Sequence, residues 1–196
     1  MFFPDYKSVI DPEIKKWFED FWGTSLNPKK GLTVVEIIDA VHSDGVKGMY
    51  VQGENPAMSD PNLNHGRSAL AKLNHLVVQD IFLTETAGFA DVILPASAFP
   101  EKTGTFTNSN RQVQLGRQAI DPPGDSRQDW WIIQEVGRRL GLDWNYESPE
   151  HIFSEVRKAT PSMAGITWER LEKEHSVTYP CTKEGDPGDP IIFENG

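Results

Sequence analysis

The sequence predicts an α/β fold of three layers, in which helices cover both faces of a central parallel sheet. Short β-branched apolar runs at 46–52, 75–82 and 91–95 are typical of buried strands. Helical patterns, with apolar residues three and four positions apart, alternate with these runs along the chain. Such alternation is characteristic of parallel strands connected by helices.

Three helices are expected before residue 75, because each apolar helical pattern there follows residues that cap or open helices. They start at Asp11-Pro12, Thr33-Val-Val-Glu36 and Asp60-Pro61. Gly23 suits the left-handed end of the first helix, and Asp44-Gly45 ends the second. The third helix carries its apolar residues at Leu63, Leu70 and Leu73.

Periodicity is lost from Pro100 to Arg117, which predicts a long polar loop with an irregular hairpin. Three further helices are expected after it. They are a helix capped by Asp125 or Ser126 with Trp130, Ile133, Val136 and Leu140 on its inner face, one opened by Ser148-Pro149, and one at 167–174. The stretch from 180 to 190 is rich in Pro, Gly and acidic residues. We therefore expect one domain over 1–179 and a linker over 180–196 that leads toward a further domain.

The composition excludes several classes of protein. The formal net charge is -10, which argues against general binding to nucleic acid or to an anionic membrane. No apolar run approaches the roughly 20 residues of a membrane span, so a soluble chain is expected. A single cysteine, Cys181, excludes an internal disulfide and a thiolate metal cage, and is compatible with a cytoplasmic location.

No standard catalytic or phosphate-binding motif occurs. Both the GxGxxG turn and the GxxxxGK[ST] loop are absent, and the five histidines are scattered without the spacing of metal ligands. Cys181 is expected to be an inert thiol. We assign no catalytic residue and no metal ligand to this chain.

Polar residues instead follow the predicted strands. Glu54 and Asn55 follow the first, Gln79 and Asp80 end the second, and a loop containing Lys102 follows the third. The carboxyl ends of parallel strands form one crevice where ligands bind. A carboxylate can accept two hydrogen bonds from guanine, and an ammonium group can neutralise phosphate, so the set suits a purine nucleotide. A turn, a cap and a solvated charge are the alternative interpretations of these residues.

Three runs carry a resemblance to a known family. They are GMYVQGENPAMSDP, HLVVQDIFLTETAGFADVILPASAFPEKTGTFTNSNRQVQ and PPGDSRQDWWIIQEVGRRLGL. Together they resemble the third domain of the catalytic subunit of molybdopterin oxidoreductases. The similarity is greatest to NAD-linked, cytoplasmic-type formate dehydrogenase alpha subunits, and it extends over nearly the whole chain.

The resemblance implies that the domain holds the guanosine diphosphate arm of one of two molybdopterin guanine dinucleotides, which carry molybdenum or tungsten. By motif, the implied contacts are Asn55, Gln79, Asp80, Lys102 and Asp129. Residues implied to lie near the cofactor or to shape its loop are Glu54, Thr84, Gly104 and Arg111. Without the resemblance, Asp129 would be interpreted only as a first-turn acid that favours the helix dipole.

The resemblance also implies a larger enzyme that oxidises formate to carbon dioxide. Its iron–sulfur cysteines, metal ligand and formate-binding residues are expected before Met1, and a cofactor-enclosing domain after Gly196. The expected partners are these remaining domains and electron-transfer subunits, and the chain alone is expected to be inactive and to hold no cofactor. The alternatives are a domain of another molybdopterin oxidoreductase, such as a nitrate reductase, and a non-catalytic nucleotide-binding module.

Overall fold

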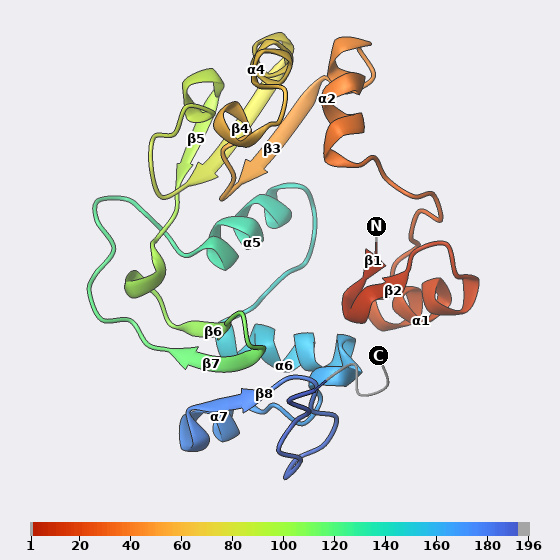
Figure 1. The fold of residues 1–196 in the computed structure, drawn as a ribbon, viewed down its shortest axis with the longest axis vertical. Helices are drawn as coiled ribbons and strands as arrows, with labels where there is room; N and C mark the ends of the chain where they lie inside the picture. The colour runs from red at the N-terminus through yellow and green to blue at the C-terminus, as the bar shows by residue number, and fades with distance from the viewer. Residues whose placement is uncertain (1, 192–196) are drawn as a thin grey trace. The chain divides into compact units, whose positions relative to one another are not determined.

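The computed structural model describes residues 2–191, and the chain divides into two compact units. The parallel-sheet unit comprises Gly31–Glu101 and Ile120–Asp143, and the antiparallel-sheet unit comprises Met1–Lys30, Lys102–Ala119 and Trp144–Gly196. Each unit has a sheet of its own (Figure 1). Each also has a hydrophobic core of its own. The expected domain boundaries at 179 and 180 stay a prediction.

The parallel-sheet unit contains the three strands that the apolar runs predict. They are β3 (Gly48–Gln52), β4 (His75–Asp80) and β5 (Val92–Pro95), hydrogen-bonded in the order β3-β4-β5 and all parallel (Figure 1). In the register of the sheet, Gln79 of β4 pairs with Gln52 on one side and Leu94 on the other. All three strands therefore end at the same edge.

Helices flank this sheet on both faces, as the fold class predicts. Leu76 and Val78, on one face of β4, form a buried cluster with Leu70 of α4 (Leu63–Lys72) and Ala57 of α3 (Pro56–Ser59). Gln79 lies on the other face, because side chains alternate along a strand, and it contacts α5 (Asp129–Arg139). The central strand is thus buried on both sides.

The helix starts in this unit agree with the sequence only in part. α2 (Val34–His42) has the predicted capping box of Thr33 and Glu36. The predicted start of α4 at Asp60-Pro61 is wrong by two residues, because Asn62 is the cap and accepts a hydrogen bond from the His65 backbone at 3.4 Å. Asp60 instead accepts from the Asn62 backbone at 2.8 Å. The short helix α3 and the 3-10 turns Ala87–Phe89 and Phe99–Glu101 were not predicted.

The predicted inner face of α5 is wrong at Ile133 and Leu140, whereas Trp130 and Val136 are half-buried. Ile132 is 6% exposed, whereas Ile133 and Leu140 are 38% and 77% exposed. The helix starts at Asp129 with Gln128 as its N-cap residue, not at Asp125 or Ser126. Apolar residues three and four apart occur on both sides of this helix, so periodicity alone cannot identify the buried one.

The antiparallel-sheet unit contains the hairpin predicted in the polar loop and a third strand that was not predicted. β6 (Gly104–Thr107), β7 (Gln112–Gly116) and β8 (Ser176–Thr178) pair antiparallel in that order. The unit also contains β1 (Phe2–Phe3), β2 (Lys7–Ser8), α1 (Pro12–Trp22), α6 (Pro149–Ala159), α7 (Trp168–Glu174) and the 3-10 turns Pro4–Tyr6 and Pro161–Met163.

The three predicted helices of this unit are confirmed, and α1 and α6 begin at the predicted starting residues. Asp11 accepts hydrogen bonds from the first-turn backbone of α1, which ends at Gly23 with φ 63°, and Ser148 and Thr167 cap α6 and α7. Cys181 is fully buried in the core of this unit, so the start of the expected linker packs within it. None of the helices within residues 2–191 is long and apolar enough to cross a membrane.

Candidate functional site

The loops that follow β3, β4 and β5 form what we call the carboxyl edge of the parallel-sheet unit. The Gly53 backbone donates to the Gln79 carbonyl at 2.9 Å, and the Ala96 backbone donates to the Asp80 carbonyl at 3.0 Å. The φ of Gly53 is 61°, in the left-handed region that glycine adopts without strain, which lets the chain turn abruptly after β3. The first residues of the loops after β3 and β5 are therefore fixed by hydrogen bonds to β4.

Asn55 ties the loop after β3 to the loop after β4. Its Oδ1 accepts from the Thr86 backbone at 3.2 Å and from Thr86 Oγ1 at 2.7 Å, and its Nδ2 donates to Glu85 Oε2 at 2.7 Å. Thr86 is fully buried, and its hydroxyl also accepts from the Ala57 backbone at 3.0 Å. The hydrogen bond from Asn55 is the main reason that the pKa of Glu85 is lowered. Asn55 thus has a structural role at the edge.

Gln79 links two residues that are distant in the sequence. Its Nε2 donates to Asp129 Oδ1 at 2.8 Å, and its Oε1 accepts from the Tyr50 hydroxyl. Gln79 is fully buried, whereas Asp129, the first residue of α5, is half-buried. Burial raises the pKa of Tyr50, and the negative charge of Asp129 raises it further. The Asp129 carboxylate is therefore held at the carboxyl edge by a buried amide.

The other predicted residues of this unit shape the loop after β4 or lie on the surface. Asp80 Oδ1 accepts from the backbones of Ile81 and Phe82 at 2.7 and 3.3 Å, so Asp80 caps the loop that it opens. Thr84 Oγ1 accepts from the Ala87 backbone at 3.3 Å and stabilises the following turn. Glu54 is exposed.

Arg127 also lies at this edge, although the sequence did not single it out. Its backbone donates to the Pro95 carbonyl at 3.1 Å and accepts from the Ser97 backbone at 2.8 Å, which aligns it with the end of β5. Arg127 is exposed, and its Nη1 donates to the Ser126 carbonyl at 2.9 Å. Its guanidinium carbon lies 5.9 Å from the centre of the Trp131 ring. The sequence signal was its place two residues before Asp129 in the run RQDWW. Tyr50 was missed because only strand register brings it to Gln79.

Three predicted residues belong to the antiparallel-sheet unit. Lys102 is half-buried just before β6, and Gly104 is the first residue of that strand. Arg111 donates through Nη1 to the carbonyls of Tyr179 and Asp189 at 2.6 and 2.9 Å, and through Nη2 to that of Pro190 at 2.6 Å. Arg111 therefore holds the C-terminal segment within its own unit. The shared edge expected for Lys102 stays a prediction.

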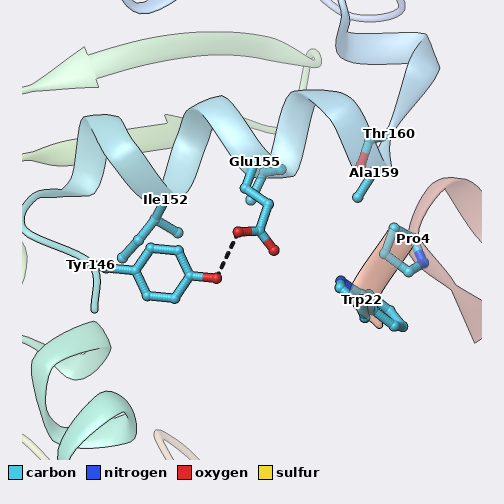
Figure 2. A pocket seen from close by; sticks show the side chains of 8 residues that line it. Pro4, Trp22, Tyr146, Ile152, Glu155, Ala159 and Thr160 are labelled. Atoms are coloured by element: carbon cyan, nitrogen blue, oxygen red, sulfur yellow. Dashed lines mark hydrogen bonds between the residues drawn. The ribbon is translucent and has the colours of Figure 1, made fainter. Parts of the chain in front are cut away.

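The antiparallel-sheet unit also has a small hollow, in which the side chains of Tyr146 and Glu155 meet (Figure 2). Its volume is about 200 Å³. The Tyr146 hydroxyl donates to Glu155 Oε2 at 2.7 Å, and burial, followed by this hydrogen bond, raises the pKa of Tyr146 to about 12. None of the cofactor-binding residues predicted from the sequence lines this hollow. Among residues 2–191, no group of three or more His, Cys, Asp or Glu could hold a metal ion.

Comparison with known proteins identifies the family. The sequence model of the molybdopterin oxidoreductase family matches residues 17–139, which is more than half of the chain. This chain belongs to the molybdopterin oxidoreductase family. The match includes both strands that position Tyr50 and Gln79, and the start of α5 with Asp129.

Several curated relatives are longer proteins of which this chain spans a minor part. It is 48% identical over 195 residues to the F420-dependent formate dehydrogenase subunit alpha of Methanocaldococcus jannaschii, covering 98% of this chain and 28% of that protein. It is 45% identical to a probable oxidoreductase of Bacillus subtilis, covering 97% of this chain and 19% of that protein. It is 42% identical to a putative formate dehydrogenase of Staphylococcus haemolyticus, covering 99% and 20%.

A solved structure supports the fold. Acetylene hydratase from Pelobacter acetylenicus matches 85% of this chain and 24% of its own chain, with a TM-score of 0.59 and 21% sequence identity. At this identity the likeness concerns the fold alone.

Proposed function

We propose that this chain binds the guanosine diphosphate end of a molybdopterin guanine dinucleotide at the carboxyl edge of its parallel sheet. The observation that carries the proposal is the Asp129 carboxylate, which is held at that edge by the buried amide of Gln79. Ligands of open parallel sheets bind outside the carboxyl ends of the strands. Membership of the molybdopterin oxidoreductase family supports a molybdopterin-type cofactor.

The groups at this edge fit the nucleotide end of such a cofactor. A carboxylate accepts two hydrogen bonds, which matches the N1–H and amino group of guanine. The guanidinium of Arg127 provides a cation suited to a phosphate oxygen. A cofactor contact by Lys102, which belongs to the antiparallel-sheet unit, stays a prediction from the resemblance. Asn55 and Asp80 keep the adjoining loops in place. When bound, the cofactor supplies the molybdenum or tungsten and the electron-transfer chemistry, and this chain holds and orients its nucleotide end.

We further propose that the chain is part of an enzyme that oxidises formate to carbon dioxide. The names of the relatives from Methanocaldococcus jannaschii and Staphylococcus haemolyticus support this substrate. The remaining domains, with their iron–sulfur clusters and electron-transfer partners, belong to the same proposal. So does a cytoplasmic location, which suits a chain whose one cysteine is free and buried.

The proposal is tested by titrating the chain with GMP and AMP while its backbone amides are followed by NMR. A single arm of an enclosed cofactor is open to water here, so we expect a weak Kd for GMP of about 0.1–10 mM, with weaker binding of AMP. Shifts should cluster at the loops after β3 and β4 and at the start of α5. Absence of purine nucleotide binding at these concentrations contradicts the proposal.

A substitution sharpens this test. Asp129→Ala removes the carboxylate, and loss of a hydrogen bond to a charged group weakens GMP binding by about tenfold or more. Asp39→Ala is the matched control, because Asp39 is an exposed carboxylate of the same unit that lies on α2 and pairs with His65. Equal Kd values for GMP in the two variants would show that Asp129 does not contact the base.

A further inference from the structure

Tyr50, Gln79 and Asp129 form a chain of two hydrogen bonds that runs from β3 through β4 to the start of α5. From this geometry we infer that Tyr50 and Gln79 are positioning residues, which orient the Asp129 carboxylate and thereby set the preference for guanine over hypoxanthine. The inference rests on the proposed function, and it assigns to Gln79 a different role from the ligand contact that the sequence implied.

The directions of the two hydrogen bonds follow from the chemistry of the three groups. An ionised carboxylate can only accept, so the amide nitrogen of Gln79 must face Asp129. The amide oxygen then faces Tyr50, whose hydroxyl must donate. Reversing the amide would place its oxygen against the carboxylate, so this network selects one orientation of the Gln79 side chain.

Burial restricts Gln79 to an indirect role. Its exposed fraction is zero, and its backbone pairs with Gln52 of β3 and Leu94 of β5 in the centre of the sheet. A ligand outside the strand ends therefore cannot contact this side chain, but Gln79 can transmit the rigidity of the sheet to Asp129. Residues that lock the rotamer of a binding group in this way determine how precisely it meets its ligand.

Tyr50 completes the arrangement. Without its hydroxyl, the buried oxygen of Gln79 would lose its donor, and the amide could rotate away from Asp129 to find another partner. A tyrosine phenol is protonated at neutral pH and able to donate. Partial burial and the charge of Asp129 raise the pKa of Tyr50 further.

The orientation of the carboxylate matters most for the second hydrogen bond of the base. Guanine offers an amino group beside N1–H, whereas hypoxanthine offers N1–H alone. A carboxylate held in the plane of guanine gains both bonds, but a rotated one keeps only one. The GMP to IMP comparison therefore reports the orientation of Asp129, whereas phosphate contacts contribute equally to both ligands.

The test compares Kd values for IMP and GMP, measured by NMR titration, in the wild-type chain and in Tyr50→Phe. One additional hydrogen bond to the Asp129 carboxylate predicts that the wild-type chain binds GMP more tightly than IMP, by about tenfold or more. Tyr50→Phe should reduce this ratio to below about twofold by weakening GMP binding, with little change in the Kd for IMP. Gln79→Met, which keeps the side-chain length and removes both hydrogen bonds, should have the same effect and serves if Tyr50→Phe does not fold.

Tyr146→Phe is the matched control, because it removes a hydrogen bond from a phenol to a carboxylate in the antiparallel-sheet unit. It should keep the wild-type ratio. Two results would overturn the inference and leave the proposed function standing. One is a ratio of the IMP Kd to the GMP Kd in folded Tyr50→Phe or Gln79→Met that equals the wild-type ratio. The other is equal binding of GMP and IMP by the wild-type chain. A chain that binds no purine nucleotide overturns the proposed function and this inference together.

Discussion

Asn55→Ala separates the structural role of Asn55 from any contact with a ligand. The substitution leaves the fully buried Thr86 hydroxyl without its acceptor, and an unsatisfied buried donor costs about 1–3 kcal/mol. The contact with Glu85 adds little because that carboxylate is on the surface. We expect a loss of about 2 kcal/mol, which for a chain of this length lowers Tm by about 4–8 °C.

The assay is thermal unfolding together with hydrogen exchange of the Ala57 and Thr86 amides, which should exchange faster in Asn55→Ala. Asn74→Ala replaces an exposed asparagine of the same unit and should leave Tm and exchange unchanged.

Because Asn55 lowers the pKa of Glu85 below 4.5, the wild-type chain gains stability above that pH and loses it as the pH falls through the lowered pKa. This acid-side loss should shrink in Asn55→Ala. Equal Tm values for the Asn55 and Asn74 variants would refute the role of Asn55.

Two further predictions concern the antiparallel-sheet unit. A Cβ at Gly165 would lie 2.2 Å from the Lys183 carbonyl oxygen, so Gly165→Ala should lower the urea midpoint of unfolding. Gly88→Ala is the control, because a Cβ there meets nothing within 4 Å, and it should lower the midpoint by less. Equal midpoints for the two variants would contradict this prediction. Because the pKa of Tyr146 is raised from 10.0 to about 12, its contribution to stability is fully present below pH 10 and is lost as the pH rises through 12. Tyr146→Phe should remove that part of the alkaline loss, and identical stability–pH curves for the variant and the wild type would contradict the assignment.

Several helix ends were predictable because their signals lie within one turn of sequence. Asp11, Thr33, Ser148 and Thr167 each accept from a backbone N–H two or three residues ahead, so the residue type and its spacing suffice. The start of α4 was wrong because Asp60 and Asn62 are both good caps, and the choice between them depends on how the preceding loop is packed. The buried face of α5 was wrong for a similar reason, since only the position of its neighbours selects Ile132 over Ile133.

The candidate site, like the helix ends, was predictable from the sequence only in part. The sequence alone indicated that polar residues follow three parallel strands, because strand ends and turns are local patterns, and the resemblance added Asp129. The sequence could not show that Asn55 hydrogen-bonds to the buried Thr86 or that Arg111 holds the C-terminal segment. The first contact spans 31 residues, and the contacts of Arg111 span at least 68 residues.

By itself, the sequence determined the α/β class, the three parallel strands, most helix starts and the location of the polar loops, all of which follow from residue type and short-range spacing. Only the tertiary structure decided which of those polar side chains are buried and which hydrogen-bond to neighbouring loops. It also decided that Gln79 binds Tyr50 and Asp129, which are 29 and 50 residues away in the sequence. The physical reason is register. A hydrogen bond between distant segments exists only once strand pairing and helix packing bring its donor and acceptor within about 3 Å, and no local pattern specifies that distance.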